Sequence, residues 1–372
     1  MTNHINFLDL QKEIQPLKEK IKNKIEDIFF KKSNFILGNE LEEFEENFAY
    51  YINTKYCIGV ANGTDALEIA LNSLQLNQDD EIITQANTYV STCLGVTNNN
   101  LNLKVVDVDP DTYQIDLDLL EKSITEKTKV ILIVHLTGSC CNMDKLMDIV
   151  NKHNLILVED CAQSHGALYN NKKLGTYGLL STFSFYPGKN LGAFGDGGSI
   201  CTNDEKLYDY IRSYRNNGCI IKYKHEIIGR NSRLDTIHAA ILDIKLKNLD
   251  LNNSKRRENA YLYNSLLKDI EEIETPKIED KCLPVYHLYI IKTEFRDALQ
   301  EYLKKNNIQS GVHYPISIYE LECYKDKLKN SSYPEKAINN SKKILSLPMY
   351  PDLTKEEIEY VCNTINNFFN VI

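Results

Sequence analysis

The sequence contains no tryptophan, and its ten cysteines include no pair in a C-x-x-C arrangement. Paired cysteines at short spacing are the usual sign of a structural zinc site or of a thioredoxin-like redox motif. Their absence leads us to expect no metal site. We interpret the cysteines as small buried side chains or as thiols without a chemical role.

Long hydrophobic runs are also missing. The longest uninterrupted aliphatic stretch, Val130 to Val134, ends at His135, whereas a helix that spans a bilayer needs about 20 apolar residues. The first ten residues include His4 and Asp9 and lack the apolar core of a secretory signal. We therefore expect a cytoplasmic protein with no membrane segment.

Positive charge is in deficit, because 43 Lys and Arg face 52 Asp and Glu and give a net charge of −9. Such a field repels the phosphate backbone of nucleic acids, so we expect no nucleic-acid partner. A small anionic ligand stays compatible with this charge, since a few local cations and backbone amides can hold it.

A chain of 372 residues is long enough for two domains of ordinary size. Apolar residues recur at helical spacing over 17–30 and again at Leu41, Phe44 and Phe48. From residue 56 onward, extended segments alternate with helical ones. We expect strands over 56–60, 81–84, 104–108, 129–136, 155–159, 182–186 and 198–202, and helices over 64–74, 143–152 and 204–215.

This alternation indicates an α/β fold with a mostly parallel sheet, whose ligands bind at the carboxyl ends of the strands. A helical run over 234–257 is expected to lead out of a large domain, residues 1–250. The remainder, residues 251–372, reads as a smaller α+β domain with a strand over 287–293 and helices over 296–305 and 355–368.

Two residues suggest chemistry. Asp160 ends an apolar strand, where a carboxylate contacts a ligand or caps a helix. Lys189 lies between a strand and a glycine-rich stretch, which suits a lysine of lowered pKa that forms a Schiff base, although it is equally the pattern of a surface lysine in a turn.

A third feature, the turn Ala61 to Ala66, joins a strand to an apolar helix. Its free amides and the Thr64 hydroxyl form a seat for one phosphate, unless Thr64 only caps the helix.

Other phosphate motifs do not match. A Walker loop requires glycine at position 183 and Ser or Thr at position 190, where this chain has Phe183 and Asn190. The stretch Gly195 to Gly198 differs from G-x-G-x-x-G, so a nicotinamide-dependent enzyme has little support.

The three features stand within a longer series of motifs. These include GVANGTDAL at 59–67, VDVDPDTY at 106–113, VEDCAQSHGA at 158–167, SFYPGKNLGAFGDGG at 184–198, NSRLD at 231–235 and GVHYPI at 311–316. In this order the sequence resembles the nucleotide-sugar aminotransferases of the DegT/DnrJ/StrS family. The resemblance implies a pyridoxal-phosphate-dependent transferase of fold type I, the aspartate-aminotransferase fold, with a seven-stranded-type sheet in the large domain.

The resemblance assigns roles around pyridoxal 5′-phosphate. Lys189 forms the Schiff base and shuttles the proton, and Asp160 pairs with the pyridine nitrogen. The other positions expected to contact the cofactor are Gly63, Thr64 and Ser184 at the phosphate, Tyr89 on the ring, Gln163 at the 3-hydroxyl, and Asn231, which reaches the phosphate of the neighbouring subunit. A homodimer with shared active sites follows from this last assignment.

On the substrate side, the resemblance implies that Tyr186, His313 and Tyr314 line the sugar. Lys222, Tyr223 and Arg230 are expected near the pyrophosphate and nucleotide, although a charged loop is commonly only solvated. His165 is either a supporting residue of the substrate site or a buried, hydrogen-bonded histidine.

The implied reaction moves an amino group from L-glutamate to a nucleotide-linked ketosugar. The sequences of these motifs are most similar to those of enzymes that act at C3 of dTDP-3-keto-6-deoxyhexoses. The alternatives are amination at C4 of a dTDP- or UDP-4-keto-6-deoxyhexose, and a regulatory protein of the same fold without turnover. A sibling branch that carries out deoxygenation has histidine in place of Lys189.

Overall fold

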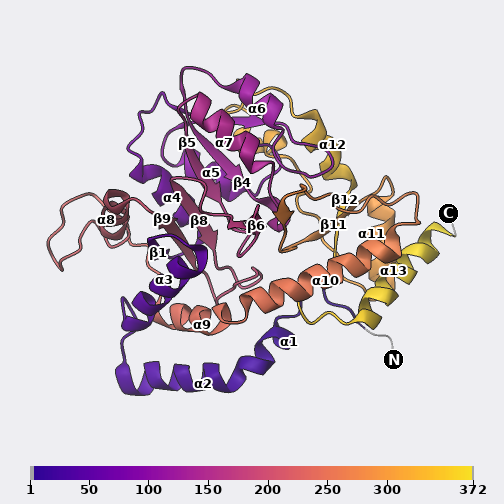
Figure 1. Ribbon diagram of the computed structural model, residues 1–372, viewed down its shortest axis with the longest axis horizontal. Helices are drawn as coiled ribbons and strands as arrows, with labels where there is room; N and C mark the ends of the chain where they lie inside the picture. Colours follow the sequence, from indigo (N-terminus) through magenta and orange to yellow (C-terminus); the bar gives the residue numbers. More distant parts are fainter. Residues whose placement is uncertain (1–3, 371–372) are drawn as a thin grey trace.

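The computed structural model describes residues 4–370 and has a seven-stranded sheet at its centre (Figure 1). Neighbouring strands are parallel, except that β9 runs antiparallel to both β1 and β8. The expected mostly parallel sheet is thus confirmed. In spatial order the strands are β1 (Tyr56–Val60), β9 (Gly198–Thr202), β8 (Leu180–Ser184), β5 (Ile156–Asp160), β4 (Thr128–Val134), β2 (Glu81–Gln85) and β3 (Asn102–Val106).

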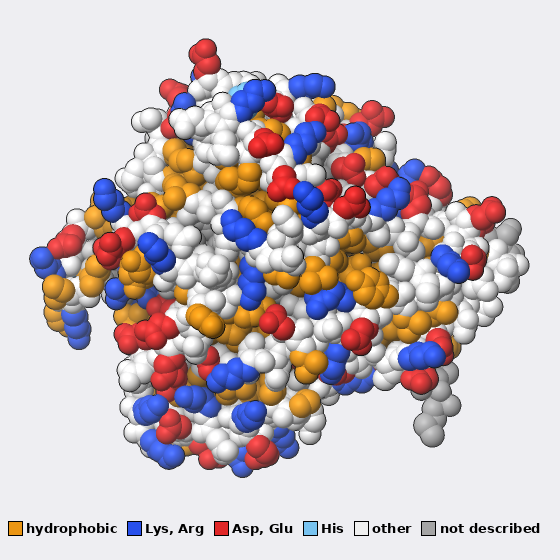
Figure 2. Space-filling view, viewed as in Figure 1, with side chains coloured by type: hydrophobic (Ala, Val, Ile, Leu, Met, Phe, Trp, Pro, Cys, Tyr) orange, Lys and Arg blue, Asp and Glu red, His pale blue; other side chains and the backbone are white. Residues whose placement is uncertain are grey.

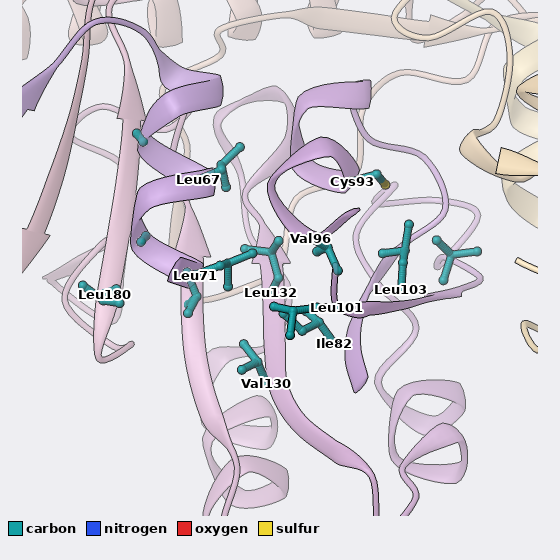
Figure 3. Close-up of a cluster of buried hydrophobic side chains, with 14 of the residues drawn as sticks. Leu67, Leu71, Ile82, Cys93, Val96, Leu101, Leu103, Val130, Leu132 and Leu180 are labelled. Carbon is teal, nitrogen blue, oxygen red and sulfur yellow. The ribbon is translucent and has the colours of Figure 1, made fainter. Parts of the chain in front are cut away.

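Helices cover both faces of this sheet, because alternate strand residues point to opposite sides. On one face, Ile82, Val130 and Leu132 pack against α4 (Gly63–Ser73) and α5 (Val90–Thr97) (Figure 3). On the other face, the adjacent residues Ile83 and Ile131 pack toward α6 (Leu117–Ser123) and α7 (Met143–Lys152).

Among the described residues, the N-terminal helix α2 packs against α9 and not against the large sheet. Figure 1 shows α2 along the lower edge of the molecule and α10 running from the sheet toward the C-terminal elements. The other elements are α1 (Leu10–Ile14), α2 (Lys18–Glu26), α3 (Asn39–Ile52), β6 (Leu168–Tyr169), β7 (Lys172–Lys173), α8 (Glu205–Tyr214), α9 (Thr236–Leu246), α10 (Leu249–Leu267), β10 (Cys282–Leu283), β11 (Tyr289–Lys292), α11 (Arg296–Lys305), α12 (Glu335–Lys343), β12 (Ile344–Leu347) and α13 (Lys355–Phe369).

The single helical run expected over 234–257 is wrong, because the chain forms two helices there. α9 ends at Leu246, and α10 begins at Leu249 and continues to Leu267. Between them Asn248 has φ −109° and ψ 2°, which departs from helical geometry. The break lets Leu246 and Leu249 both be buried in the core that α3 and α9 share with the sheet.

The C-terminal elements form a second core around the antiparallel pair β11–β12, with α10, α11 and α13. Two segments cross between the cores. Ile5 bridges to Ile308 and is buried in the C-terminal core, whereas Ile318 and Leu328 are buried in the core of the large sheet. A division of the chain at residue 250 stays a prediction. Within residues 4–370, every helix falls short of the length and hydropathy needed to cross a membrane.

Candidate functional site

The candidate site lies where strands β5 and β8 end and helices α4 and α5 begin. Asp160 is the last residue of β5, and Ser184 is the last residue of β8. The two strands are neighbours and parallel, so their carboxyl ends meet at the same edge of the sheet. Lys189 is the fifth residue after the end of β8, and its N–H donates to the carbonyl of Tyr186 at 2.8 Å.

The phosphate seat is built from the first turn of α4. Asn62 is the N-cap, and its side-chain oxygen accepts the N–H of Asp65 at 2.8 Å. The alternative that Thr64 caps the helix is therefore wrong. The Thr64 hydroxyl instead forms a hydrogen bond with the hydroxyl of Ser91 at 2.7 Å.

Gly63 and Ser184 meet closely at this seat. A Cβ atom on Gly63 would lie 2.6 Å from the Cβ of Ser184 and 3.0 Å from its Oγ. Only glycine leaves room at this position for the end of β8. The helix amides, the Thr64 hydroxyl and the Ser184 hydroxyl thus share one small region, and this donor set suits a phosphate group.

Asp160 is 4% exposed, and its carboxylate has one fixed donor on each oxygen. The N–H of Ala162 donates to Oδ1 at 3.1 Å, and the hydroxyl of Thr92 donates to Oδ2 at 2.8 Å. Burial raises the pKa of Asp160, and these two donors together with the nearby Lys189 oppose that rise. A buried anion of this kind fits beside a protonated ring nitrogen. Sequence reasoning missed Thr92, which lies on a helix that it did not predict.

Lys189 is mostly buried, so the alternative of a surface lysine is wrong. Burial lowers the pKa of Lys189 to about 8, and the negative charge of Asp160 acts in the opposite direction. The next residue, Asn190, anchors the turn. Its amide nitrogen donates to Asn253 Oδ1 at 2.9 Å and to the carbonyl of Val285 at 3.1 Å, and its amide oxygen lies 3.1 Å from His287 Nδ1.

Gln163, Tyr314 and Tyr89 come together although they are far apart in the chain. Gln163 accepts the N–H of Thr137 at 2.7 Å and donates its amide to the Tyr314 hydroxyl at 3.0 Å. The ring centroids of Tyr314 and Tyr89 are 5.6 Å apart. Burial raises the pKa of Tyr314, so its hydroxyl stays neutral and can donate.

His313 lies beside this group and is held from two sides. Its Nδ1 is 2.9 Å from the hydroxyl of Ser346, and its ring stacks on Phe7 with a centroid distance of 5.5 Å. Burial lowers the pKa of His313 to about 4, and the charge of Lys189 adds to that effect. The imidazole is therefore neutral near pH 7. Tyr186, in contrast, is 59% exposed.

His165 does not line the surface of the site. It is fully buried, with ring centroids 5.5 Å from Phe183 and 5.9 Å from Phe185. Neither ring nitrogen has a hydrogen-bond partner among the described residues, so the alternative of a hydrogen-bonded buried histidine does not describe it either. Burial lowers the pKa of His165 to about 3.

The loop that carries Lys222 and Tyr223 projects away from the body beyond α8 (Figures 1 and 2). The loop closes at an isolated bridge between Asn216 and Asn231. The ammonium of Lys222 lies 5.1 Å from the centroid of the exposed Tyr223 ring. The structure therefore does not bring either residue against Asp160 or Lys189 within this chain.

Arg230 turns back from the base of this loop toward α4. Its guanidinium forms ion pairs with Glu68 at 2.6 Å and with Asp65 at 3.3 Å. Asn231 is exposed and, with Ala61 and Asp196, lines a hollow of about 430 Å³. Its expected contact with a neighbouring subunit stays a prediction.

A buried group next to Asp160 has a structural role that sequence reasoning also missed. Glu159 accepts the N–H groups of Gly175, Tyr177 and Gly178, each at 2.7 Å, and its Oε2 lies 2.9 Å from His135 Nε2. Burial raises the pKa of Glu159, but these donors outweigh it and the pKa is lowered. Although Cys161 is also close enough to share an ion with Glu159 and His135, the carboxylate is already saturated, and we read the group as a clamp on the loop that precedes β8.

The chain is similar to known proteins over almost its whole length. Residues 15–366 match the profile of the DegT/DnrJ/EryC1/StrS aminotransferase family. A dTDP-3-amino-3,6-dideoxy-alpha-D-galactopyranose transaminase from Aneurinibacillus thermoaerophilus is 40% identical over 98% of this chain and 99% of its own length. A protein from Geobacillus stearothermophilus named pleiotropic regulatory protein is 38% identical over 98% and 99%.

Among solved structures, DesV from S. venezuelae superposes with a TM-score of 0.95 at 36% identity, covering 98% of each chain. NtdA from Bacillus subtilis, solved with bound cofactor PMP, superposes with a TM-score of 0.91 at 32% identity and covers 99% of this chain and 85% of its own. The matched residues 15–366 include the seat, the buried carboxylate and the lysine described above. The chain belongs to the DegT/DnrJ/EryC1/StrS aminotransferase family and is an aminotransferase that uses pyridoxal phosphate.

Proposed function

We propose that the chain transfers the amino group of L-glutamate to C3 of a dTDP-3-keto-6-deoxyhexose and so yields a dTDP-3-amino-3,6-dideoxyhexose. The placement of Lys189 near the buried Asp160, at the edge that carries the phosphate seat, supports the chemistry. The 40% identity to the Aneurinibacillus transaminase supports the sugar and the position. A purely regulatory protein has no chemical need for the pair Lys189 and Asp160.

The residues of the seat fit pyridoxal phosphate. When bound, that cofactor supplies an electron sink for the carbon that loses or gains the amino group. In our proposal the amides of α4 at Gly63, with the hydroxyls of Thr64 and Ser184, hold the phosphate. Asp160 holds a proton on the pyridine nitrogen, because its buried negative charge favours the protonated ring.

Lys189 moves the proton at the reacting carbon. With a pKa of about 8, about a tenth of its amine is unprotonated at pH 7, far more than for a free lysine, and this fraction is available as a base. Tyr89 covers the face of the ring, and Gln163, whose amide now contacts Tyr314, faces the 3-hydroxyl. The burial that lowers the pKa of the Lys189 amine also limits the water that can reach this carbon.

The sugar in this proposal contacts Tyr186, His313 and Tyr314. Neutral imidazole and phenol groups can each donate or accept a hydrogen bond to a hydroxyl without adding charge. In this proposal Arg230, Lys222 and Tyr223 meet the diphosphate and the nucleotide. Because the loop after α8 that carries Lys222 and Tyr223 projects away from the body, we assign these two residues to the outer, nucleotide end of the ligand. His165 supports the wall from behind Phe183 and Phe185.

The proposal includes a homodimer in which Asn231 of each subunit completes the phosphate site of the other. The exposed position of Asn231, beside the Ala61 end of the phosphate turn, is compatible with a contact of that kind. Equilibrium sedimentation of the purified protein measures the oligomeric state, and a monomer contradicts this part of the proposal.

Amination at C4 of a dTDP- or UDP-4-keto-6-deoxyhexose is the second candidate. The similarity to a protein named GDP-perosamine synthase from Escherichia coli O157:H7, which is 32% identical over 90% of this chain, supports a nucleotide sugar other than a dTDP sugar. A protein named UDP-2-acetamido-2-deoxy-3-oxo-D-glucuronate aminotransferase from Pseudomonas aeruginosa, 37% identical over 98% of this chain, favours a UDP carrier.

A competition experiment separates these candidates. The enzyme is incubated with ¹⁵N-labelled L-glutamate and an equimolar mixture of 3-keto and 4-keto sugars on dTDP and UDP, and NMR of the products locates the label. We expect the label at C3 of the dTDP sugar. Preferential labelling at C4, or of a UDP sugar, contradicts the proposal.

A further inference from the structure

The segment Thr88 to Thr92, where α5 begins, contacts both ends of the proposed cofactor site. Ser91 forms a hydrogen bond with Thr64 at the phosphate seat, at 2.7 Å. Thr92 donates to the Asp160 carboxylate at 2.8 Å. Of this segment, the sequence assigned a role to Tyr89 alone.

The hydrogen bonds of Thr88 and Thr92 can run in one direction only. Their hydroxyl oxygens are 2.7 Å apart, and the residues are 3% and 1% exposed. A hydroxyl has one proton to donate, and an ionised carboxylate only accepts. Since the proton of Thr92 goes to Asp160, Thr88 must donate to Thr92. The two hydroxyls therefore form a relay that ends on Oδ2 of Asp160.

We propose that Thr92, oriented by Thr88, is a positioning residue that fixes the Asp160 carboxylate toward the pyridine nitrogen of the cofactor. This inference rests on the role of Asp160 in the proposed function. Ala162 holds the other oxygen of Asp160 at 3.1 Å, so the carboxylate has one donor on each side and cannot rotate without breaking one of them. Its remaining lone pairs are left for the ring.

A positioning role and a merely structural role predict different results. If the hydroxyl of Thr92 only satisfies a buried group, its loss lowers stability and leaves the ring unchanged. If it also holds the charge of Asp160 in place, its loss moves the proton on the ring nitrogen toward the carboxylate. Burial already raises the pKa of Asp160, and the Thr92 hydrogen bond opposes that rise.

The test uses holoenzymes loaded with pyridoxal phosphate that carries ¹⁵N in the ring. The variants are T92V, which removes the donor, T92S, which restores it, and T88V, which removes only the first hydroxyl. T97V is the control, because Thr97 lies on the same helix and bonds to the Cys93 carbonyl and the Tyr324 hydroxyl, away from Asp160.

In T92V we expect the ¹⁵N resonance to shift toward that of an unprotonated ring, and kcat to fall about 10- to 100-fold, as for the loss of a hydrogen bond to a charged group. T88V should shift the resonance the same way by a smaller amount. T92S and T97V should match the wild type.

An unchanged resonance in T92V, or an equal shift in T97V, overturns the inference. If T92V does not fold, an unchanged resonance in T88V overturns the relay. The D160N variant distinguishes the proposed role of Asp160 from the inferred role of Thr92. If D160N leaves the resonance unchanged, the proposed role of Asp160 fails. If D160N shifts it and T92V does not, only the role of Thr92 fails.

Discussion

Gly63 and Ser184 lie so close together that a Cβ on Gly63 would be 2.6 Å from the Cβ of Ser184. The contact joins the start of α4 to the end of β8, the two elements that form the phosphate seat. The spacing between them is therefore set by the absence of a side chain at position 63.

Gly63→Ala should separate these elements and weaken cofactor binding. We expect the Kd for pyridoxal phosphate to rise about 5- to 150-fold, since overpacking of a tight contact costs about 1–3 kcal/mol and each 1.4 kcal/mol is a tenfold change in Kd. Fluorescence titration of the apoprotein measures the Kd. The double variant G63A/S184G relieves the clash but lacks the hydroxyl, so it should recover Tm without recovering full affinity. A G63A protein with wild-type affinity contradicts this use of the glycine.

The pH dependence of Lys189 reactivity should reveal the effect of the Asp160 charge on the pKa of Lys189. The pKa of Lys189 is lowered to about 8 by burial, and the Asp160 anion raises it. Removal of that anion in Asp160→Asn should therefore move the midpoint of Lys189 reactivity below about 8. Competitive acetylation of the apoprotein across pH, read by mass spectrometry of the Lys189 peptide, measures both midpoints. A midpoint that rises or stays constant in D160N would show that the two groups do not interact.

Much of the sheet could be predicted from the sequence. The predicted strands over 56–60 and 198–202 agree with β1 and β9, and the predicted helix over 143–152 agrees with α7, because each has a clear apolar period and clear end signals. The sequence does not predict α5, since half of the residues in VSTCLGVT are β-branched and one is glycine, and both kinds are poor helix formers. Its buried face, with Cys93 and Val96, packs on the sheet and overrides that preference (Figure 3).

The site could be predicted only in part, for a related reason. The motifs pointed to Lys189, Asp160 and Gly63, each of which has a local pattern. The partners that hold such residues come from distant parts of the chain, as Thr92 does for Asp160 and Tyr314 does for Gln163. Such pairs depend on how helices pack against the sheet, and no local period encodes them.

His165 should make the protein less stable in acid. Its pKa is about 3 in the folded chain, against an ordinary value of 6.5. As pH falls below 6.5, His165 binds a proton in the unfolded chain but stays neutral in the folded chain. The free energy of unfolding therefore decreases progressively between about pH 6.5 and about pH 3.

Between about pH 7 and about pH 5, His165→Leu should reduce the loss of unfolding free energy by about 2 kcal/mol relative to the wild type. Urea denaturation at the two pH values measures the difference. Because burial also lowers the pKa values of His287 and His313, the variant should keep a remaining acid dependence. Parallel curves for wild type and variant would show that His165 is not the buried base.

Arg230 should matter for substrate binding more than for stability. Its ion pairs with Glu68 and Asp65 lie on a side chain that is 40% exposed, so Arg230→Ala should cost less than about 1 kcal/mol of unfolding free energy. If Arg230 meets the diphosphate, KM for the nucleotide sugar should rise about 10-fold with little change in kcat. Lys224→Ala, which removes one positive charge from the same loop, is the control. Equal KM values for both variants would place Arg230 outside the binding site.

The central claim is that Lys189 is the amine that holds the cofactor at this site. Borohydride reduction of the holoprotein, followed by digestion and mass spectrometry, identifies the lysine that becomes covalently labelled. We predict one pyridoxyl group per chain, on the peptide that contains Lys189, and none in Lys189→Ala. A label on a different lysine, or no label on a protein that binds the cofactor, would contradict it.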